Sequence, residues 1–241
     1  MGDMLSLTQA ATGLGVNPQT LRRWHKAGKL RPSFISPGGH RYYLASDIKQ
    51  FMDPLFQEAS LWAKAPKDTA PPLSDDVYCQ NQAVFQYRLG RFSSDLEAKV
   101  LPDMAAILVA ITGEIGNNSF DHNLGNWLDV PGVYFGYDVG KGKIVLADRG
   151  QGILKTLCRV RPTLTDDQEA LRVAFSEVIS GRAPESRGNG LKFVREQLRE
   201  RHLLLSLQSG TARWSFIDDE EQIVAVPEKV FGTLTRIDFS L

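Results

Sequence analysis

The stretch SLTQAATGLGVNPQTLRRWHKAGKLRPSFISPGGHRYYLASDIKQF, residues 6–51, decides how the first part of the chain folds. Ser6 is a predicted N-cap for a first short helix, because its hydroxyl can accept from a free backbone amide. A tight turn follows, and Asn17 with Pro18 predicts the start of a second helix. Gly28 is a typical residue for the end of that helix.

The residues after Gly28 predict a hairpin and a last short helix. Two short strands flank the Pro-Gly-Gly turn at residues 37–39, and Ser46 is a predicted cap for the final helix. In the second helix, Leu21 and Trp24 are three residues apart and can pack inward, which turns the basic side chains outward. A helix, a glycine-containing turn, a helix and a hairpin together are typical of proteins that place a helix in the major groove.

The charge distribution supports a reader of polyanions at this end of the chain. The whole chain has 28 basic and 28 acidic residues, but residues 1–53 hold seven basic against three acidic residues, so residues 54–241 are acidic by four charges. Apolar residues at 42% exclude a disordered chain. Two cysteines exclude a disulfide framework and indicate a reducing cytoplasm. The longest apolar run, residues 104–111, is far below the roughly 20 residues of a membrane span, so we expect no membrane partner.

Residues 6–51 resemble the winged helix-turn-helix of MerR-type regulators and of related excisionase-like modules. The segments TLRRWHKAGKL and GGHRYYLASDI carry this resemblance. It implies a DNA-binding domain over residues 1–53 with double-stranded DNA as its partner. The alternative for the basic helix face alone is an ordinary solvated surface. The side chains that the resemblance places on the major groove or on phosphates are Arg22, Arg23, Lys26, Arg41 and Tyr42.

A linker is predicted for residues 54–76, because residues 66–72 are rich in proline and extended chain is expected there. The following 25 residues, 77–101, have mixed apolar spacing and are interpreted as a helical segment that covers the second domain or builds a dimer contact. The second domain is predicted to span residues 77–241, with its core from about residue 95.

One predicted helix in the second domain carries a polar stripe beside an apolar face. Glu114, Asn118 and Asp121 fall at i, i+4 and i+7, next to apolar residues at helical spacing. A solvated stripe is the common reason for such spacing, and a ligand site is the alternative. Downstream, Asp148 ends a predicted strand and is followed by Gly150 and Gly152, where the backbone can approach a ligand closely.

The order of four segments is similar to the ATP-binding domain of the GHKL superfamily, which includes gyrase, MutL, the 90-kDa heat-shock chaperone and histidine kinases. The segments are EIGNNSFDH, DRGQGI, RGNGL and the closing GTLTRIDFSL. The resemblance covers about residues 95–241. It implies an α/β fold, a Bergerat-type α/β sandwich with a mixed sheet and helices on one face, and it implies ATP and Mg²⁺ as cofactors.

The resemblance also assigns roles. Asn118 would coordinate the Mg²⁺ that bridges the phosphates, and Asp148 would accept the adenine amino group. Gly150 and Gly152 would shape the adenine pocket, while Thr233 would touch the nucleotide. The remaining residues that the resemblance places at the nucleotide are Asp121 in the polar stripe, with Gly188 and Gly190 at the phosphates.

The role of Glu114 determines whether the second domain is a nucleotide sensor or an enzyme. The resemblance places there the general base that activates water in gyrase and MutL, so Glu114 is the candidate catalytic residue of an ATPase. The alternative is that Glu114 only orders a bound water. Some parts of relatives are absent: no His lies between His40 and His122 to accept a phosphoryl group, and residues 153–187 lack a second glycine-rich loop.

The leading interpretation is therefore a DNA-binding transcriptional regulator, cytoplasmic and nucleoid-associated, whose ATP domain switches oligomeric state or DNA occupancy. A homodimer and a further protein partner are expected. The first alternative is a DNA-targeted ATPase or an anti-sigma-like Ser/Thr protein kinase. The second alternative is an excisionase-like architectural factor.

Overall fold

The computed structural model describes residues 3–177, 190–217 and 219–241 and separates into two compact units. The first unit is Met1–Glu58 and the second is Ala59–Leu241. The division falls inside a helix, α4 (Pro54–Lys64), and not after residue 53 where the sequence placed the end of the first domain.

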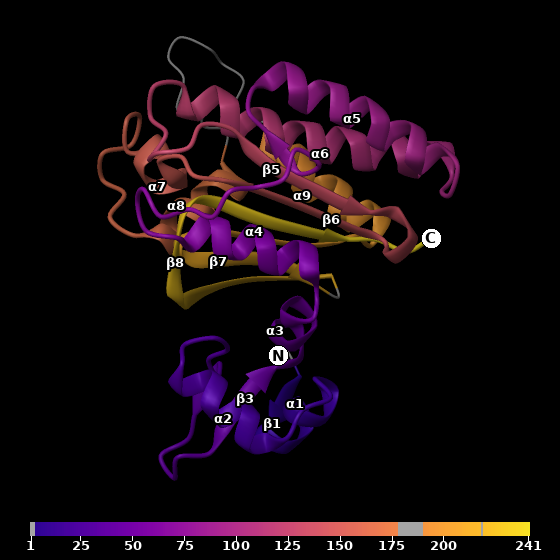
Figure 1. Ribbon diagram of the computed structural model, residues 1–241. Coiled ribbons are helices and arrows are strands. Elements are labelled where there is room, and N and C mark those ends of the chain that lie inside the picture. The colour runs from indigo at the N-terminus through magenta and orange to yellow at the C-terminus, as the bar shows by residue number, and fades with distance from the viewer. Residues whose placement is uncertain (1–2, 178–189, 218) are drawn as a thin grey trace. The chain divides into compact units, whose positions relative to one another are not determined.

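The first unit is a small helical domain with three short antiparallel strands in the order β1-β3-β2. Two of the three predicted N-caps are present: the Ser6 side chain accepts from the Gln9 amide, and the Asn17 side chain accepts from the Gln19 amide. The predicted cap at Ser46 is wrong, because α3 begins at Ala45 and Ser46 lies within its first turn. Its elements are β1 (Met4–Ser6), α1 (Leu7–Gly13), α2 (Pro18–Lys26), β2 (Phe34–Ile35), β3 (Arg41–Leu44) and α3 (Ala45–Phe51) (Figure 1).

The core of the first unit turns the basic face of α2 toward solvent. Leu21 of α2 is fully buried, and Trp24 packs its ring against Phe51 with 5.2 Å between ring centroids. Because these two apolar residues face inward, Arg22 and Arg23 between them point outward and are exposed.

The second unit is built on a five-stranded sheet in the order β4-β5-β6-β8-β7. Every pair of neighbouring strands in the described residues is antiparallel, so the mixed sheet that the sequence suggested is wrong. The physical reason is that β5–β6 and β7–β8 are hairpins, which need no crossover helix. The strands are β4 (Tyr78–Cys79), β5 (Val133–Asp138), β6 (Lys143–Asp148), β7 (Leu204–Ile217) and β8 (Glu220–Asp238).

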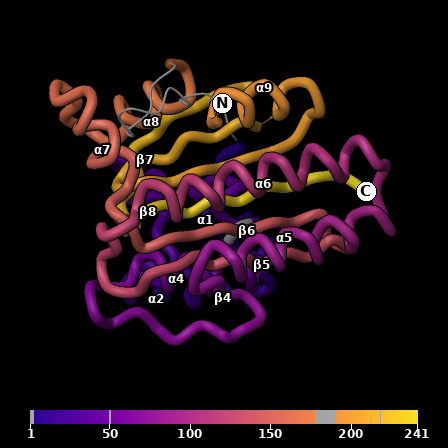
Figure 2. Tube along the Cα trace, turned by 90° about the horizontal axis from the view of Figure 1, so that it is seen from above, coloured from indigo at the N-terminus to yellow at the C-terminus, as the bar shows by residue number. Residues whose placement is uncertain are grey.

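Helices α5, α6 and α9 lie over one face of this sheet, as the view from above shows (Figure 2). Phe85 of α5 fills the space between α6 and the sheet: its ring lies 5.4 Å from that of Phe135, and a Cβ at Gly116 would lie 2.1 Å from it. The helices of this unit after α4 are α5 (Gln82–Glu97), α6 (Pro102–Asn123), α7 (Gly152–Leu157), α8 (Asp167–Ser176) and α9 (Gly190–Arg201), with a 3-10 turn at Val139–Lys141.

The other face of the sheet is covered as well, which departs from the expectation of helices on one face only. Tyr134 and Val145 point away from the main core and are fully buried, and α4 lies on that side (Figure 1). The predicted linker therefore begins as a helix: Trp62 and Ala63 of α4 are buried, and this burial stabilises a helix in the part of the linker that precedes the proline-rich residues 66–72.

The segment interpreted as helical over residues 77–101 begins with β4, and its helix is α5. Within the described residues, none of the helices combines the length and the apolar character that crossing a bilayer requires.

Candidate functional site

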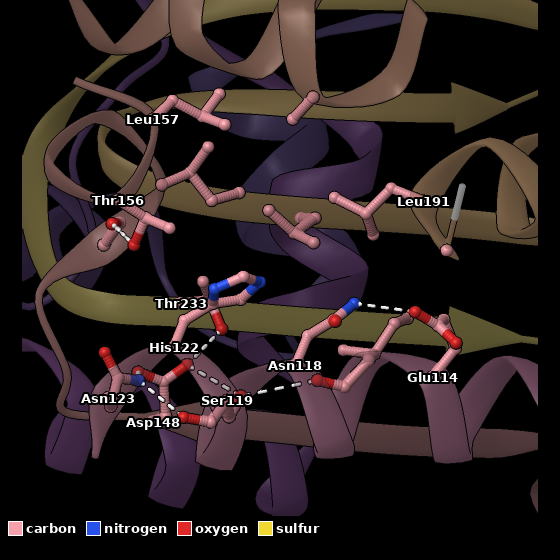
Figure 3. Close-up of a pocket in the computed structure, with 16 residues that line it drawn as sticks. Glu114, Asn118, Ser119, His122, Asn123, Asp148, Thr156, Leu157, Leu191 and Thr233 are labelled. Atoms are coloured by element: carbon pink, nitrogen blue, oxygen red, sulfur yellow. Dashed lines mark hydrogen bonds between the residues drawn. The ribbon is translucent and has the colours of Figure 1, made fainter. Parts of the chain in front are cut away.

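A pocket in the second unit brings together most of the residues that the sequence singled out (Figure 3). It lies between α6, the chain after β6, and the start of α9, with Thr233 of β8 at its base. Figure 3 shows the polar side chains of α6 along one side and the apolar Leu157 and Leu191 on the other. The α6 residues that line it are Glu114, Ile115, Asn118, Ser119, His122 and Asn123.

Helix geometry explains why Asp121 does not line the pocket although Glu114 and Asn118 do. At 100° per residue, Asn118 lies about 40° to one side of Glu114 on the helix circumference, and His122 lies about 80° to the same side. Asp121 lies about 20° to the opposite side and so falls outside the pocket. The sequence showed a polar stripe, but it could not show on which side of Glu114 the pocket opens.

Asp148 forms the polar end of the pocket beneath Thr233. Its side chain is 1% exposed. A carboxylate has about four lone-pair sites, so the surrounding protein fills its capacity. The four donors are Ser119 Oγ at 3.0 Å, Asn123 Nδ2 at 3.1 Å, the Gly150 amide at 2.8 Å and Thr233 Oγ1 at 2.5 Å.

Burial raises the pKa of Asp148 above its ordinary value, and the hydrogen bonds from Thr233, Gly150 and Ser119 act against that rise. The carboxylate is thus held by four neutral donors, none of which is a cation. Because Asp148 is already stripped of water, it binds a neutral hydrogen-bond donor more favourably than a solvated surface carboxylate does.

Gly232 makes this arrangement sterically feasible. Its φ of +81° is in the left-handed region, and a Cβ there would lie 2.2 Å from Asp148 Oδ1. Glycine is therefore required directly before Thr233. No local pattern in the sequence indicates this requirement, because the contact joins residues 84 positions apart.

The second polar end of the pocket is the pair Glu114 and Asn118. The Asn118 side-chain amide donates to Glu114 Oε1 at 3.1 Å. Gly190, the first residue of α9, lies directly over this carboxylate, and a Cβ there would lie 1.6 Å from Glu114 Oε1. The amino end of α9 thus borders the pocket at Glu114, and the amino end of a helix favours anions.

Asn118 could hold one coordination position of a divalent cation. With its nitrogen donating to Glu114, the amide oxygen is the atom that a cation would use. Mg²⁺ keeps several waters and takes few protein ligands when phosphate oxygens are present. Since the described residues contain no group of three or more His, Cys, Asp or Glu side chains placed for a metal, a cation here would depend on its ligand's own oxygens.

The other residues that the sequence placed at the nucleotide differ in whether they line the pocket. Gly152 and Thr233 line the pocket, whereas Gly150 stands behind it and contributes only its amide to Asp148. Gly188 lies outside the described residues. Ser119 and Asn123 were not predicted from the sequence, because at i+5 and i+9 they lie about 140° and 180° around α6 from Glu114, beyond His122 and outside the polar stripe.

The first unit carries a separate candidate surface, formed by α2 and the β2–β3 hairpin. Arg22, Arg23 and Lys26 are exposed on α2, while Arg41 and Tyr42 on β3 are partly buried. The Arg41 side chain donates through Nε to His25 Nδ1 at 3.0 Å. This hydrogen bond connects the hairpin to α2.

The surroundings of His25 favour its neutral form. Burial and the nearby charges of Arg41 and Arg31 lower the pKa of its imidazole. A neutral ring is needed for Nδ1 to accept from Arg41, so the site favours the form that makes the contact. We assign His25 to the positioning of Arg41, a role that the sequence alone did not suggest.

Comparisons with known proteins bear on parts of the chain. Residues 6–43 match the model of the MerR family regulatory protein, so the N-terminal domain is of the MerR type. The chain is also similar to the type II methyltransferase M.Eco47II of Escherichia coli, with 37% identity over 73 residues. That match covers 30% of this chain and 16% of the enzyme, so the chain spans only a small part of this relative.

Proposed function

We propose that the chain is a sequence-specific DNA-binding transcriptional regulator whose second unit binds an adenine nucleotide with Mg²⁺. Nucleotide state would then alter oligomeric state or DNA occupancy. The match of residues 6–43 to the MerR family supports the DNA-binding part, together with the exposed cations of α2.

The observation that carries the nucleotide part is the pairing of two polar ends in one pocket. Asp148 at one end offers a buried acceptor to an exocyclic amine, and the apolar Leu157 and Leu191 offer a wall to a flat ring. Glu114 and Asn118 at the other end lie beside the start of α9, where phosphates would be favoured. The proposed ligand has the same order of groups: amine, aromatic ring, then anion.

Each polar residue has a defined part in this proposal. The hydroxyls of Ser119 and Thr233 can rotate, so an entering amine can share Asp148 with them without leaving a buried donor unpaired. Asn118 would coordinate the cation, and the cation would neutralise phosphate charge when bound. A homodimer would place two copies of α2 on half-sites about one helical turn apart.

Glu114 supports a second candidate function, a DNA-targeted ATPase or kinase. Its carboxylate lines the pocket beside Asn118, so a water on the bound phosphate would lie within reach of it. A carboxylate that only orders a water would occupy the same position. Product formation is what separates the two functions.

Calorimetric titration of the full chain with ATP, ADP and AMP, each with and without Mg²⁺, tests the proposal. We expect ATP to bind more tightly with Mg²⁺ present and AMP to show little Mg²⁺ dependence. Phosphate release and protein phosphorylation measured on the same sample separate a sensor from an enzyme. If no adenine nucleotide binds at millimolar concentration, the nucleotide part of the proposal is wrong, and the DNA part stands on its own evidence.

A further inference from the structure

The residue directly after Asp148 is a buried arginine that does not line the pocket. Arg149 has a relative exposure of 0% and is among the largest fully buried side chains of the described chain. Burying a guanidinium is costly unless each of its five N–H groups has a partner. The partners of Arg149 therefore indicate what this residue does.

All five donors of Arg149 are used, and three of them hold one backbone segment. Nε and Nη2 form a bidentate pair with the Asp129 carboxylate at 2.8 and 2.6 Å. Nη1 donates to the Trp62 carbonyl at 2.5 Å and to the Ala65 carbonyl at 2.8 Å. Nη2 also donates to the Pro66 carbonyl at 3.2 Å. The segment that Arg149 holds is the end of α4 and the chain that leaves it, which we name the α4 anchor segment, residues 62–66.

Arg149, which holds the anchor segment, is connected to the pocket in two ways. Arg149 follows Asp148 in the chain, and Asp148 is the buried acceptor of the pocket. The guanidinium also lies 5.7 Å from the ring of Phe231, which is followed by Gly232 and Thr233. A change at Asp148 or Thr233 therefore reaches the arginine through one or two residues.

The same segment belongs to the part of the chain that joins the two units. α4 begins at Pro54 in the first unit and ends at Lys64 in the second. Lys64 adds an ion pair with Glu228 at 2.8 Å. Residues adjacent in sequence to the pocket therefore contact the end of the helix that joins the two units.

We propose that Arg149 is a positioning residue that couples occupancy of the pocket to the α4 anchor segment, and through it to the DNA-binding unit. A ligand that donates a hydrogen bond to Asp148, or that displaces the Thr233 hydroxyl from it, changes the position of the neighbouring peptide, and the rigid guanidinium passes this change to three carbonyls of the segment. The inference rests on the nucleotide-binding function proposed above and adds how that site is read out.

The test compares Arg149→Lys and Asp129→Asn with the wild-type full chain. Lysine keeps the charge but cannot form the bidentate pair and hold three carbonyls at once. Arg236→Lys is the matched control, because Arg236 is also buried and forms a bidentate pair, with Asp238 at 2.7 Å through both nitrogens, on the same sheet. Two quantities are measured: operator DNA affinity with and without Mg-ATP, and hydrogen exchange of residues 59–66 with and without Mg-ATP.

In the wild type and in Arg236→Lys, we expect ATP to change DNA affinity by 5- to 150-fold and to change exchange in residues 59–66. In Arg149→Lys, we expect that factor to fall toward one while ATP affinity stays within about threefold. Asp129→Asn should behave in the same way and serves if the lysine variant does not fold.

Three outcomes separate the possibilities. Full coupling in both Arg149→Lys and Asp129→Asn overturns the inference and leaves the nucleotide function intact. A wild-type protein that binds ATP without any change in DNA affinity overturns the inference and the proposed switching of DNA occupancy, and leaves nucleotide binding intact. A wild-type protein that binds no adenine nucleotide overturns the proposed function and this inference together.

Discussion

The two units present their candidate functional residues in opposite ways. In the first unit, Arg22, Arg23 and Lys26 are exposed on one helix, outside any buried network. In the second unit, Asp148 and Arg149 are buried, and each has four or five partners drawn from distant parts of the chain. Exposed charges contribute small effects that depend on salt, whereas buried polar networks fail as a whole when one member is lost.

The largest effect is expected from breaking the Arg149–Asp129 pair. Both side chains are nearly inaccessible, at 0% and 4%. Asp129→Ala leaves a buried guanidinium without its counter-ion, and we expect a loss of about 3–5 kcal/mol in the free energy of unfolding. Denaturant unfolding of the full chain measures this. An exposed pair such as Arg161–Glu177 is the control, and Glu177→Ala should cost less than about 1 kcal/mol.

The Arg149–Asp129 pair should also make the free energy of unfolding depend on pH in the acid range. Hydrogen bonds from Arg149 lower the pKa of Asp129 from 3.8 to about 2. Because the folded pKa lies below the unfolded one, the stabilisation is complete above the unfolded pKa and is lost as pH falls toward 2. The shift corresponds to about 2–3 kcal/mol. Between pH 5 and pH 2, the free energy of unfolding of the wild type should fall by this amount more than that of Asp129→Asn. If the free energy of unfolding of both proteins changes equally with pH, the pair does not stabilise the fold.

Catalysis is the next test of the buried region. If the protein turns ATP over, Glu114→Gln should keep nucleotide binding and lose roughly 10²-fold or more in rate, the scale of a general base. Glutamine retains an oxygen that can accept from Asn118, so the pocket keeps its shape. Single-turnover phosphate release measures the rate. An unchanged rate would exclude Glu114 as the base.

Loss of the buried acceptor should weaken binding more than it weakens folding. Asp148→Asn replaces a charged partner, and we expect adenine nucleotide affinity to fall by about 1.5–3 kcal/mol. Calorimetry measures the affinity, and thermal unfolding shows whether the fold is kept. Asp103→Asn, an exposed carboxylate in the first turn of α6, should bind like wild type. Equal affinities in Asp148→Asn and Asp103→Asn would remove Asp148 from the recognition of the ligand.

The difference between the two units also explains what the sequence could predict. The helices, caps and hairpin of the first unit depend on residues within a few positions of one another, such as Ser6 with Gln9 and Asn17 with Gln19. Local physical chemistry therefore predicts them. The exposed basic side chains of α2 follow from helical periodicity, because the apolar Leu21 and Trp24 show which face is inside.

In the second unit, the sequence predicted Glu114, Asn118 and Asp148 as pocket residues but not the network that holds them. Ser119, Asn123 and Thr233 meet at Asp148 from positions up to 85 residues away, and no local pattern shows that meeting. The strand pairing was also hidden, since alternation in a buried strand does not reveal the direction of its neighbour. Arg149 reads in the sequence as an ordinary charged loop residue, and only its burial reveals its role.

The smallest effects are expected from replacing the exposed cations of the first unit. These replacements are the sharpest test of the difference between exposed charges and the buried network. Arg22→Ala and Arg23→Ala each remove a charge that we expect to contact a phosphate or a base edge of DNA. Loss of a phosphate contact should lower the slope of log affinity against log salt by roughly one. Lys49→Ala is the control, because Lys49 is exposed on α3 and is not part of the predicted interface.

Arg41→Ala should weaken DNA binding more than Arg22→Ala does, because Arg41 also donates to His25 and so fixes the hairpin against α2. We expect a reduced salt slope together with weaker sequence discrimination, since a mobile hairpin positions α2 less well in the groove. His25→Ala keeps every cation and should therefore reduce discrimination while leaving the salt slope unchanged. If His25→Ala changes neither the sequence discrimination nor the salt slope, the hydrogen bond positions nothing. The exposed surface would then act as a sum of independent charges, without the cooperative character found in the buried region.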